Sequence, residues 1–351
     1  MAWLTGWQYR KKITIDQTKV DANLSDFPVL VKLTSSNFDF SKALSTGYDV
    51  RFTSSDGETL LKYERERHDQ ANSLAEYWVK VPSVSGTVDT DFYIYYGKSD
   101  ASDGSDAANV WDSNHKLVVH SKDLTTSTVK DSVTGSSFSK QSANHPIEAD
   151  GKIGKAQNYD GSQDYIDCEA GSGLDITGTA ITLEALVNIT SYVDGGMFFC
   201  KGNSVGEPPY KQYTLEERVV NSIGYMRFMG DFDGTCANND DTTEIGTGSW
   251  KYLVVSYDGA NVRFYIDGSP TTSPARTGNL MTHSTWKLLL GKVTYGELYF
   301  NGKMDEMRIS NSVRSAAWIK ATYNSNFDTL VSYGGEEQPS THRQASFFEV
   351  M

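Results

Sequence analysis

The chain has 351 residues, a formal net charge of −13 and a hydrophobic content of 38%, which indicates a soluble protein long enough for two domains. The surplus of acidic residues disfavours binding to nucleic acid or to anionic lipid, because both need a basic surface. No hydrophobic run approaches the roughly 20 residues of a membrane span, and the N-terminus lacks the basic start and apolar stretch of a signal peptide. We therefore expect neither membrane insertion nor a secretory signal.

Turn signals are spread over most of the chain. Asp-Gly occurs eight times, and Asn301-Gly302 adds another turn pair of the same kind. Asp-Gly tolerates the positive φ of tight hairpin turns, so this spacing predicts many short antiparallel strands. The expected fold class is all-β, with two tandem antiparallel β-sandwich domains of jelly-roll type. One short helix is expected over Ser315–Tyr323, with Ser315 as its cap.

Strand-like runs follow one another in the N-terminal half. They are found at 9–15, 27–33, 50–53, 74–81 and 91–96. The small polar residues of 97–109 then have the composition of a linker, and strand-like residues resume at 115–120. We therefore predict domains at 1–112 and 113–335, followed by a C-terminal tail at 336–351.

The segment Trp250–Pro270 carries the clearest local signal in the second half. Two β-rich runs, Tyr252–Tyr257 and Asn261–Ile266, are each closed by an Asp-Gly pair. This arrangement predicts two consecutive antiparallel strands and the start of a third.

Several segments of the second half carry a family resemblance through their joint order. They are Gly151–Ile166, Ile181–Asn188, Trp250–Pro270, Gly302–Ser310 and Arg314–Tyr323. Together they resemble a laminin-G-like, concanavalin A-like lectin domain, over about residues 115–335. The resemblance implies a β-sandwich, in a family that usually holds a ligand. It does not identify that ligand, because one fold hosts many functions.

The first half carries a second resemblance, in five segments. They are Trp7–Ile15, Phe27–Val31, Tyr48–Phe52, Tyr77–Pro82 and Phe92–Gly97. These segments resemble a bacterial and viral domain family of unknown function that often directly precedes a lectin-like domain. That family has no agreed activity, so the resemblance implies an architecture and no chemistry.

The sequence shows no recognisable catalytic pattern. Glycosidases on this type of sandwich carry paired carboxylates on one strand, because one acid donates a proton while the other attacks or activates water. No such run occurs: Glu64 and Glu66 lie in the other domain, and the neighbours Asp305 and Glu306 would face opposite sides of a strand. The six histidines are scattered, and hydrolase and nucleotide motifs are missing. We expect no enzyme activity.

Calcium is the cofactor that the second half suggests, because relatives of this fold often bind Ca²⁺. The segment Asp231–Glu244 is dense in oxygen donors, which calcium requires. The candidate ligands are Asp231, Asp233, Asp240, Asp241 and Glu244. Asp160 and Asp164 form a second candidate cluster. The alternative is a solvated acidic loop, since neither cluster has the spacing of a known calcium motif.

Sugar binding needs aromatic faces that stack on the C–H surfaces of a pyranose, beside fixed polar groups. The aromatic residues near turn-rich segments are Tyr192, Tyr210, Tyr213, Phe232, Trp286 and Tyr295. These are the candidate ligand-binding residues, with burial in a sandwich core as the alternative for each.

The three cysteines leave at least one thiol unpaired. We expect reduced thiols, with a Cys200–Cys236 or a Cys168–Cys200 bridge as the open alternatives.

These observations favour a non-catalytic, surface-exposed binding or structural protein. A virion decoration, fibre or adhesion component of a phage or virus fits the missing signal peptide and the free thiols. Its expected partners are a glycan or cell-surface polysaccharide and other assembly subunits, and homo-oligomerisation stays open. The first alternative is a secreted or cell-surface lectin module, and the second is a glycoside hydrolase with an unrecognised site.

Overall fold

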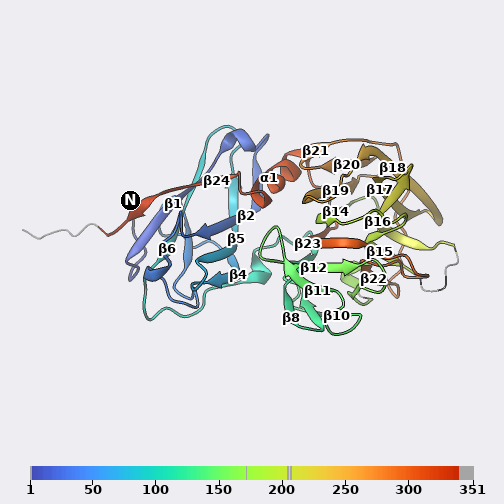
Figure 1. The fold of residues 1–351 in the computed structure, drawn as a ribbon. Helices are drawn as coiled ribbons and strands as arrows, with labels where there is room; N and C mark the ends of the chain where they lie inside the picture. Colours follow the sequence, from blue (N-terminus) through green and yellow to red (C-terminus); the bar gives the residue numbers. More distant parts are fainter. Residues whose placement is uncertain (1, 171, 204, 206–207, 340–351) are drawn as a thin grey trace, which may run out of the picture.

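Four β-sheets build two neighbouring lobes in the computed structural model, which describes residues 2–170, 172–203, 205 and 208–339. The blue N-terminal lobe lies beside the second, green-to-orange lobe, and helix α1 (Ala316–Asn326) lies at their junction (Figure 1). All strand pairs are antiparallel in the described residues, for example between residues 9–15 and 90–96. The predicted all-β class with one short C-terminal helix is confirmed.

The core of the N-terminal lobe lies between two sheets. Their strands are β1 (Tyr9–Ile15), β2 (Leu24–Thr34), β3 (Arg51–Ser54), β4 (Tyr63–Asp69), β5 (Leu74–Val84), β6 (Thr90–Tyr96) and β24 (Val331–Glu337). The strand orders are β24-β1-β6-β3 and β2-β5-β4. Side chains alternate across β2 and β5, so Val29, Val31 and Tyr77 face this core while Leu30 and Trp78 face the second lobe.

The second lobe is a larger sandwich of a nine-stranded and an eight-stranded sheet. Its strands are β7 (His115–Val119), β8 (Asp123–Thr125), β9 (Thr128–Lys130), β10 (Ser137–Lys140), β11 (Ile147–Asp150), β12 (Lys155–Asp160), β13 (Ile166–Asp167), β14 (Ile181–Ile189), β15 (Met197–Gly202), β16 (Lys211–Val220), β17 (Ile223–Phe232), β18 (Thr235–Glu244), β19 (Lys251–Tyr257), β20 (Val262–Ile266), β21 (Ser269–Pro270), β22 (Lys287–Leu290) and β23 (Asn301–Ser310). The orders are β18-β17-β16-β15-β22-β13-β10-β9-β8 and β11-β12-β23-β14-β19-β20-β21, with β7 also paired to β23. Short 3₁₀ helices span Gln17–Lys19, Phe40–Lys42, Ala107–Asn109 and Ser172–Leu174.

Hydrophobic alternation explains the strands that were predicted, and β4 and β18 are two examples of polar strands that it does not predict. The sequence Tyr-Glu-Arg-Glu-Arg-His-Asp of β4 is charged, yet it pairs along the hydrophobic strand β5. Strand β18 was predicted as an acidic loop, but it pairs with β17 through a tight turn at Asp233-Gly234, where both residues have positive φ. In both cases the backbone ladder of a neighbouring strand outweighs the poor strand propensity of charged residues.

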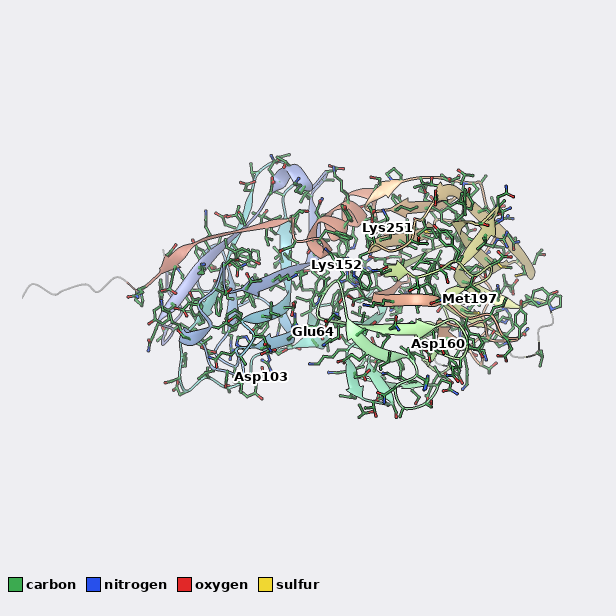
Figure 2. The ribbon with its side chains drawn as sticks, viewed as in Figure 1. Glu64, Asp103, Lys152, Asp160, Met197 and Lys251 are labelled. Atoms are coloured by element: carbon green, nitrogen blue, oxygen red, sulfur yellow. The ribbon has the colours of Figure 1, made fainter. Side chains whose placement is uncertain are left out.

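The two lobes share a hydrophobic interface between sheets. Leu30 and Trp78 from the N-terminal lobe pack with Leu186 and Val254 from the outer face of the eight-stranded sheet, and Ile319 of α1 completes the cluster. The four sheets therefore stack in layers, and the side chains drawn in Figure 2 fill the junction around Glu64. Because each middle sheet is covered on both faces, the two sandwiches support each other.

The end of the described chain returns to the N-terminal lobe. Trp318 and Leu330 belong to the core of that lobe, and β24 pairs with β1 along residues 331–337. Ser315 caps α1, as predicted, by accepting a hydrogen bond from the backbone N–H of Trp318. The predicted second domain ends at residue 335, and the predicted tail covers 336–351. The structure instead uses 331–337 as an edge strand of the first sheet, and residues 340–351 lie outside the described part.

All three cysteines are free: Cys168 and Cys200 are buried, and Cys236 is half-buried. The expected reduced thiols are confirmed, and neither of the bridges left open forms. Among the described helices, none has the length and hydrophobicity that a membrane crossing requires.

Glu217 gives the folding stability a predictable pH dependence. Its side chain is buried, one oxygen accepts the backbone N–H of Val193 at 2.8 Å, and the other has no partner among the described residues. Burial raises the pKa of Glu217 to about 8, against 4.5 for an ordinary glutamate, and the hydrogen bond offsets this only in part. The folded state therefore holds a proton that the unfolded state loses.

We expect the free energy of unfolding to fall between pH 4.5 and pH 8 by a few kcal/mol through this group, and then to level off. In Glu217→Gln this contribution disappears, so the variant should gain stability relative to the wild type as the pH rises. Urea unfolding at pH 5 and pH 8 measures the difference. Glu297→Gln, whose side chain is 79% exposed, should follow the wild type at both pH values. If the free energy of unfolding changed equally with pH in Glu217→Gln and in the wild type, the raised pKa of Glu217 would be contradicted.

Candidate functional site

The predicted calcium residues do not converge in the structure. Strand β17, the following turn and strand β18 spread them along the chain, so that Asp240 pairs with Arg227 at 2.6 Å while Asp241 accepts Thr271 and Thr272. Asp233, in the turn before β18, accepts the backbone N–H of Asn279. The full candidate set was Asp231, Asp233, Asp240, Asp241 and Glu244. Calcium needs about six oxygens around one point, and the structure does not bring these five side chains together around one.

Asp160 and Asp164 do lie together, with His145 as a third neighbour. Asp164 binds His145 Nδ1 at 3.0 Å and accepts the backbone N–H of Asp160. The Asp160 carboxylate accepts Ser162 and Gln163, which form a tight turn. These carboxylates organise the loop after β12 and offer few free oxygens, so they also fit calcium poorly.

The aromatic candidates divide into buried and half-buried residues. Tyr213 and Phe232 lie in the core of the second lobe, which is the alternative that the sequence left open for each aromatic candidate. Tyr192 packs against the same core, and its hydroxyl accepts the backbone N–H of Gly246. Alternation explains the two buried positions, since Tyr213 and Phe232 occupy core-facing positions of β16 and β17.

The remaining candidates form two ring pairs near the start of β16. Trp286 stacks on His283 with ring centroids 3.5 Å apart and an interplanar angle of 4°, and Tyr210 contacts Tyr295 at 5.7 Å. All four rings are half-buried. We call this group, Tyr210, His283, Trp286 and Tyr295, the aromatic patch.

Buried polar groups fix the aromatic patch from below. Asp231, which is 1% exposed, binds His283 Nε2 at 2.6 Å. Asp175 accepts the backbone N–H of His283 and also Gln212 Nε2, which ties the loop to β16. One oxygen each of Asp231 and Gln212 has no partner among the described residues. His283 and the Trp286 ring stacked on it are therefore held in place, and Asp231 and Gln212 each keep one acceptor oxygen with unused capacity.

A second polar site lies between the lobes and was not predicted. Two β-bulges create it: Glu66 is the extra residue where β4 pairs with β5, and Glu306 lies in the bulge where β23 pairs with β14. Met304 and Met307 face the core, so Asp305 and Glu306 both face the N-terminal lobe. Strict alternation had placed these two acids on opposite sides, and the extra residue of the bulge explains why that expectation is wrong.

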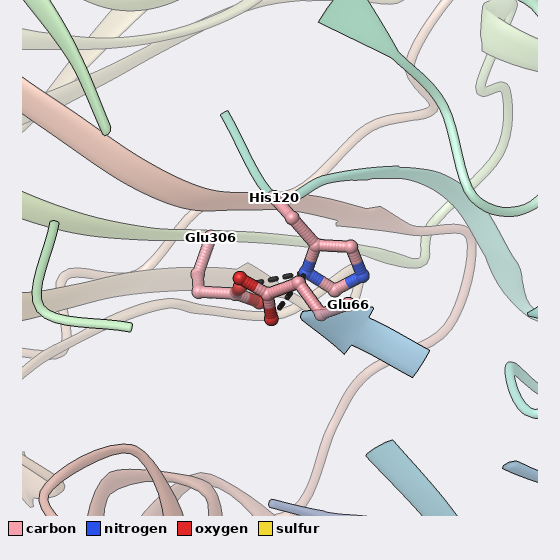
Figure 3. A group of neighbouring side chains, drawn as sticks. All are labelled: Glu66, His120 and Glu306. Atoms are coloured by element: carbon pink, nitrogen blue, oxygen red, sulfur yellow. Dashed lines mark hydrogen bonds and ion pairs between the residues drawn. The ribbon is translucent and has the colours of Figure 1, made fainter. Parts of the chain in front are cut away.

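His120 lies at the centre of this interlobe site. Its Nδ1 is 2.6 Å from Glu306 Oε1 and 3.7 Å from Glu66 Oε2, and its Nε2 is 3.2 Å from Glu64 Oε2. Figure 3 shows the Glu66 and Glu306 carboxyl groups together on the Nδ1 side of the ring. Glu64 and Glu66 come from the N-terminal lobe, whereas His120 and Glu306 come from the second.

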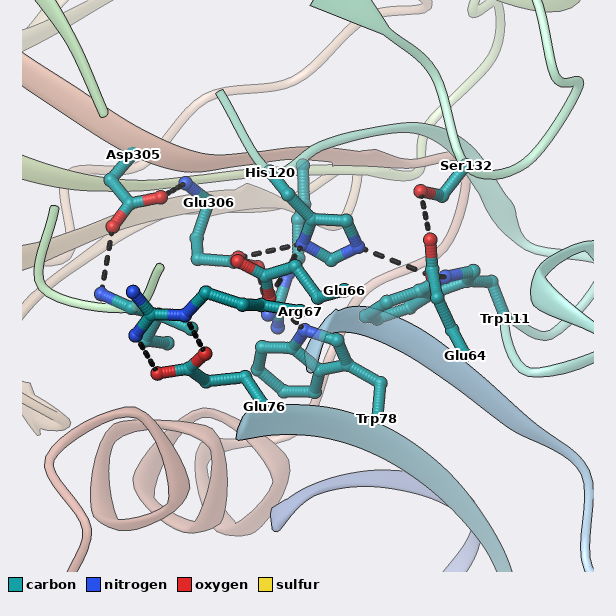
Figure 4. A network of polar contacts seen from close by, with 12 residues as sticks. Glu64, Glu66, Arg67, Glu76, Trp78, Trp111, His120, Ser132, Asp305 and Glu306 are labelled. Atoms are coloured by element: carbon teal, nitrogen blue, oxygen red, sulfur yellow. Dashed lines mark hydrogen bonds and ion pairs between the residues drawn. The ribbon is translucent and has the colours of Figure 1, made fainter. Parts of the chain in front are cut away.

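Indole and guanidinium groups surround the acids (Figure 4). Trp78 Nε1 donates to Glu66 and Trp111 Nε1 donates to Glu64, both at 2.9 Å. Arg308 donates to Glu306 at 2.6 Å, and its guanidinium carbon lies 4.5 Å from the ring centroid of Trp78. Such charge-assisted bonds hold each carboxylate in one orientation.

Burial and charge separate the pKa values of these acids. Burial raises the pKa of Glu66 to about 8, because the nearby His120 offsets it only in part. Burial acts the same way on Glu64, but His120 and three hydrogen bonds outweigh it and lower the pKa of Glu64 to about 2. Burial disfavours a charged His120, yet the carboxylates of Glu306, Glu64 and Glu66 outweigh it and raise the pKa of His120 well above its usual value.

Two pockets open beside the interlobe site and share Glu66 and Lys122. The smaller has a volume of about 440 Å³ and reaches Glu64 and His120. The larger, of about 760 Å³, runs along β4 toward the turn between β11 and β12. A glycine is required in that turn at position 154, where φ is +49° and a Cβ atom would lie 2.2 Å from Glu66 Oε1.

Two family models match parts of the chain. Residues 160–320 match the Concanavalin A-like lectin/glucanases superfamily, and residues 46–131 match a domain of unknown function (DUF2341). Both resemblances seen in the sequence are confirmed, and the second lobe is a concanavalin A-like domain. No curated protein matches the chain.

Several solved structures resemble part of the chain at low identity. Domain 4 of an extracellular arabinanase from Geobacillus stearothermophilus, solved with arabinotriose, has a TM-score of 0.42 and 21% identity, covering 62% of this chain and 99% of that one. The binding domain of Paraclostridial Mosquitocidal Protein 1 has a TM-score of 0.47 and 12% identity, covering 64% and 54%. The binding domain of botulinum neurotoxin serotype G has a TM-score of 0.46 and 10% identity, covering 60% and 50%. The chain thus spans about half of each of these two toxin domains.

Proposed function

We propose that the protein is a non-catalytic carbohydrate-binding protein and that the aromatic patch is its binding surface. The observation that carries this proposal is the half-buried ring of Trp286. This ring stacks on the imidazole of His283, and buried Asp231 in turn holds that imidazole through Nε2. A flat ring of this kind stacks on the C–H face of a pyranose, and nearby acceptors orient the hydroxyls. The concanavalin A-like fold supports the same class of ligand.

Several features support binding over cleavage. A glycosidase needs a carboxylic acid and a carboxylate that both reach the scissile bond. In the interlobe site, however, Glu64 accepts hydrogen bonds from Trp111 and Ser132 and lies against His120. In the aromatic patch, the nearby acid Asp231 is occupied by His283. We therefore propose that neither site cleaves glycosidic bonds.

Replacement of Trp286 by alanine tests the proposal. A glycan array identifies oligosaccharides that the wild type binds, and titration calorimetry then gives their affinities. Loss of a central stacking ring costs about 2 kcal/mol, so we expect Trp286→Ala to weaken binding roughly 30-fold. Tyr48→Ala, which removes a ring 39% exposed in the other lobe, should bind like the wild type. Equal affinities for Trp286→Ala and Tyr48→Ala, or no binding to any glycan, would refute the proposal.

We further propose a surface-exposed role, in which the protein decorates a virion or another assembly and contacts other subunits. The free thiols and the acidic charge of the chain support this setting. A secreted lectin module is the alternative. Antibody labelling of purified particles distinguishes them, since a decoration protein labels intact particles and a secreted lectin stays in the medium.

A further inference from the structure

We infer that Glu66, His120 and Glu306 form a binding site for one divalent first-row metal ion, of the Zn²⁺ or Mn²⁺ class, that links the two lobes. One His and two carboxylates are a common ligand set for such ions. One ligand comes from β4 of the N-terminal lobe, one from the residue after β7, and one from β23. The ion would therefore act as an interlobe clamp, independent of the aromatic patch.

The spacing of the ligand atoms suits such an ion. The donor atoms of the three side chains lie within 4.8 Å of one another. His120 Nδ1 is 2.6 Å from Glu306 Oε1 and 3.7 Å from Glu66 Oε2. Ligands about 2.1 Å from a tetrahedral metal are about 3.4 Å apart, so side-chain shifts below 1 Å bring both separations to that value.

The partners around the ligands give each one a suitable orientation. When a metal ion replaces the proton on His120 Nδ1, Glu64 accepts the remaining N–H from Nε2, 3.2 Å away, and Nδ1 faces Glu66 and Glu306. This carboxylate–histidine arrangement is typical of the outer shell of metal sites. Trp78 donates to Glu66 Oε2 and Arg308 donates to Glu306 Oε2. Coordination through Glu306 Oε1 and through the second lone pair of Glu66 Oε2 therefore keeps both hydrogen bonds.

An unpartnered buried oxygen independently indicates a missing ligand. The Glu66 side chain is 3% exposed, and its Oε1 has no hydrogen-bond partner among the described residues. The site also holds four acids, Glu64, Glu66, Asp305 and Glu306, and its ion pairs to them come from His120 and Arg308. Full ionisation leaves surplus negative charge away from water, which is costly unless a cation compensates it.

The smaller pocket provides a path to the site. It is lined by Glu64, Glu66 and His120 and has a volume of about 440 Å³, enough for water molecules that complete the coordination sphere. A metal site needs ligands, supported orientation and an access path, and the interlobe site combines all three.

Metal binding by the full-length protein tests the inference. The metal-free protein, prepared with a chelator and dialysed, is titrated with Co²⁺ and, separately, Zn²⁺ in competition with a chromophoric chelator. The variant is Glu66→Gln, which keeps an acceptor for Trp78 and the side-chain volume. The control is Asp164→Asn, because His145, Asp160 and Asp164 form the matching group of one His and two carboxylates elsewhere.

We expect about one ion per chain in the wild type and in Asp164→Asn, and at least a tenfold weaker affinity in Glu66→Gln. In the Co²⁺ form, one exchangeable imidazole proton should show a hyperfine shift in NMR, from His120 Nε2–H. Binding of less than 0.2 equivalents by the wild type, or equal affinity in Glu66→Gln, would overturn the inference. Loss of binding in Asp164→Asn alone would assign the metal to the other group and also overturn it. Glu66→Gln should keep wild-type glycan affinity, which separates this test from that of the aromatic patch.

Discussion

Replacement of Trp318 by alanine is expected to lower the free energy of unfolding by about 3–5 kcal/mol. Trp318 lies on α1, is 7% exposed, and packs edge-on against Phe27 of β2 at 4.9 Å. The guanidinium of Arg314 lies 4.3 Å from its ring centroid. The loss combines a cavity in the N-terminal core with a broken tie between the C-terminal segment and the first lobe. Urea unfolding followed by circular dichroism measures it.

Lys320→Ala on the same helix is the matched control. Lys320 forms an exposed ion pair with Asp21, with side chains 40% and 55% exposed, so we expect a change below about 1 kcal/mol. Near-equal stabilities of the two variants would show that α1 contributes little to the N-terminal core. The same result would contradict the assignment of residues 316–337 to that lobe.

Asp112→Ala is expected to destabilise the protein by about 3–5 kcal/mol, because it leaves a buried arginine without its anion. Asp112 lies in the linker between the lobes and binds Arg314 through two hydrogen bonds of 2.7 Å. It also binds His115 Nδ1 at 2.8 Å. Burial alone would raise the pKa of Asp112, but these partners outweigh it and lower the pKa well below its usual range. The measurement is thermal or urea unfolding at pH 7.

Asp106→Ala provides the comparison for Asp112→Ala. Asp106 pairs with Lys62 at 2.7 Å, but the side chains are 30% and 57% exposed, and such surface pairs contribute about 1 kcal/mol or less. If both variants lost the same stability, the buried linker network would have no special role in joining the lobes.

The hydrophobic strands were predictable from the sequence because their signal is local. Strand β1 matches its predicted range, and β19 and β20 differ by one residue from theirs. The polar strands β4 and β18 were not predictable in this way, since their stability comes from pairing with β5 and β17. Strand propensity alone predicts loops for such charged segments, because it does not include the backbone hydrogen bonds to a neighbouring strand.

The candidate sites show the same limit. Tyr210, Trp286 and Tyr295 of the aromatic patch were predictable from their turn-rich surroundings. Tyr213 and Phe232 have similar surroundings in the sequence, and only the alternation of side chains within β16 and β17 shows that these two are buried. The interlobe site depends on two bulges and on residues from β4, β7 and β23. A run such as Glu64-Arg-Glu66 gives no signal of a partner 240 residues away, so this site needed the structure.

The two sites have separate physical roles in this account. The aromatic patch lies on the nine-stranded sheet, and the interlobe site lies on the outer face of the eight-stranded sheet. The core of the second lobe separates these sheets. The proposed glycan site and the proposed metal site can therefore be tested independently of each other.

The most direct test of the central claim is product analysis after binding. Wild-type protein is incubated for days with the oligosaccharide that binds best on the array, and the sugar is then measured by mass spectrometry. If the protein binds the sugar without cleaving it, the sugar is recovered at full length. With Trp286→Ala, we expect most of the sugar to remain unbound. Accumulation of shorter sugars in the wild type, abolished by Glu64→Gln or Glu66→Gln, would contradict the account and identify the interlobe acids as catalytic.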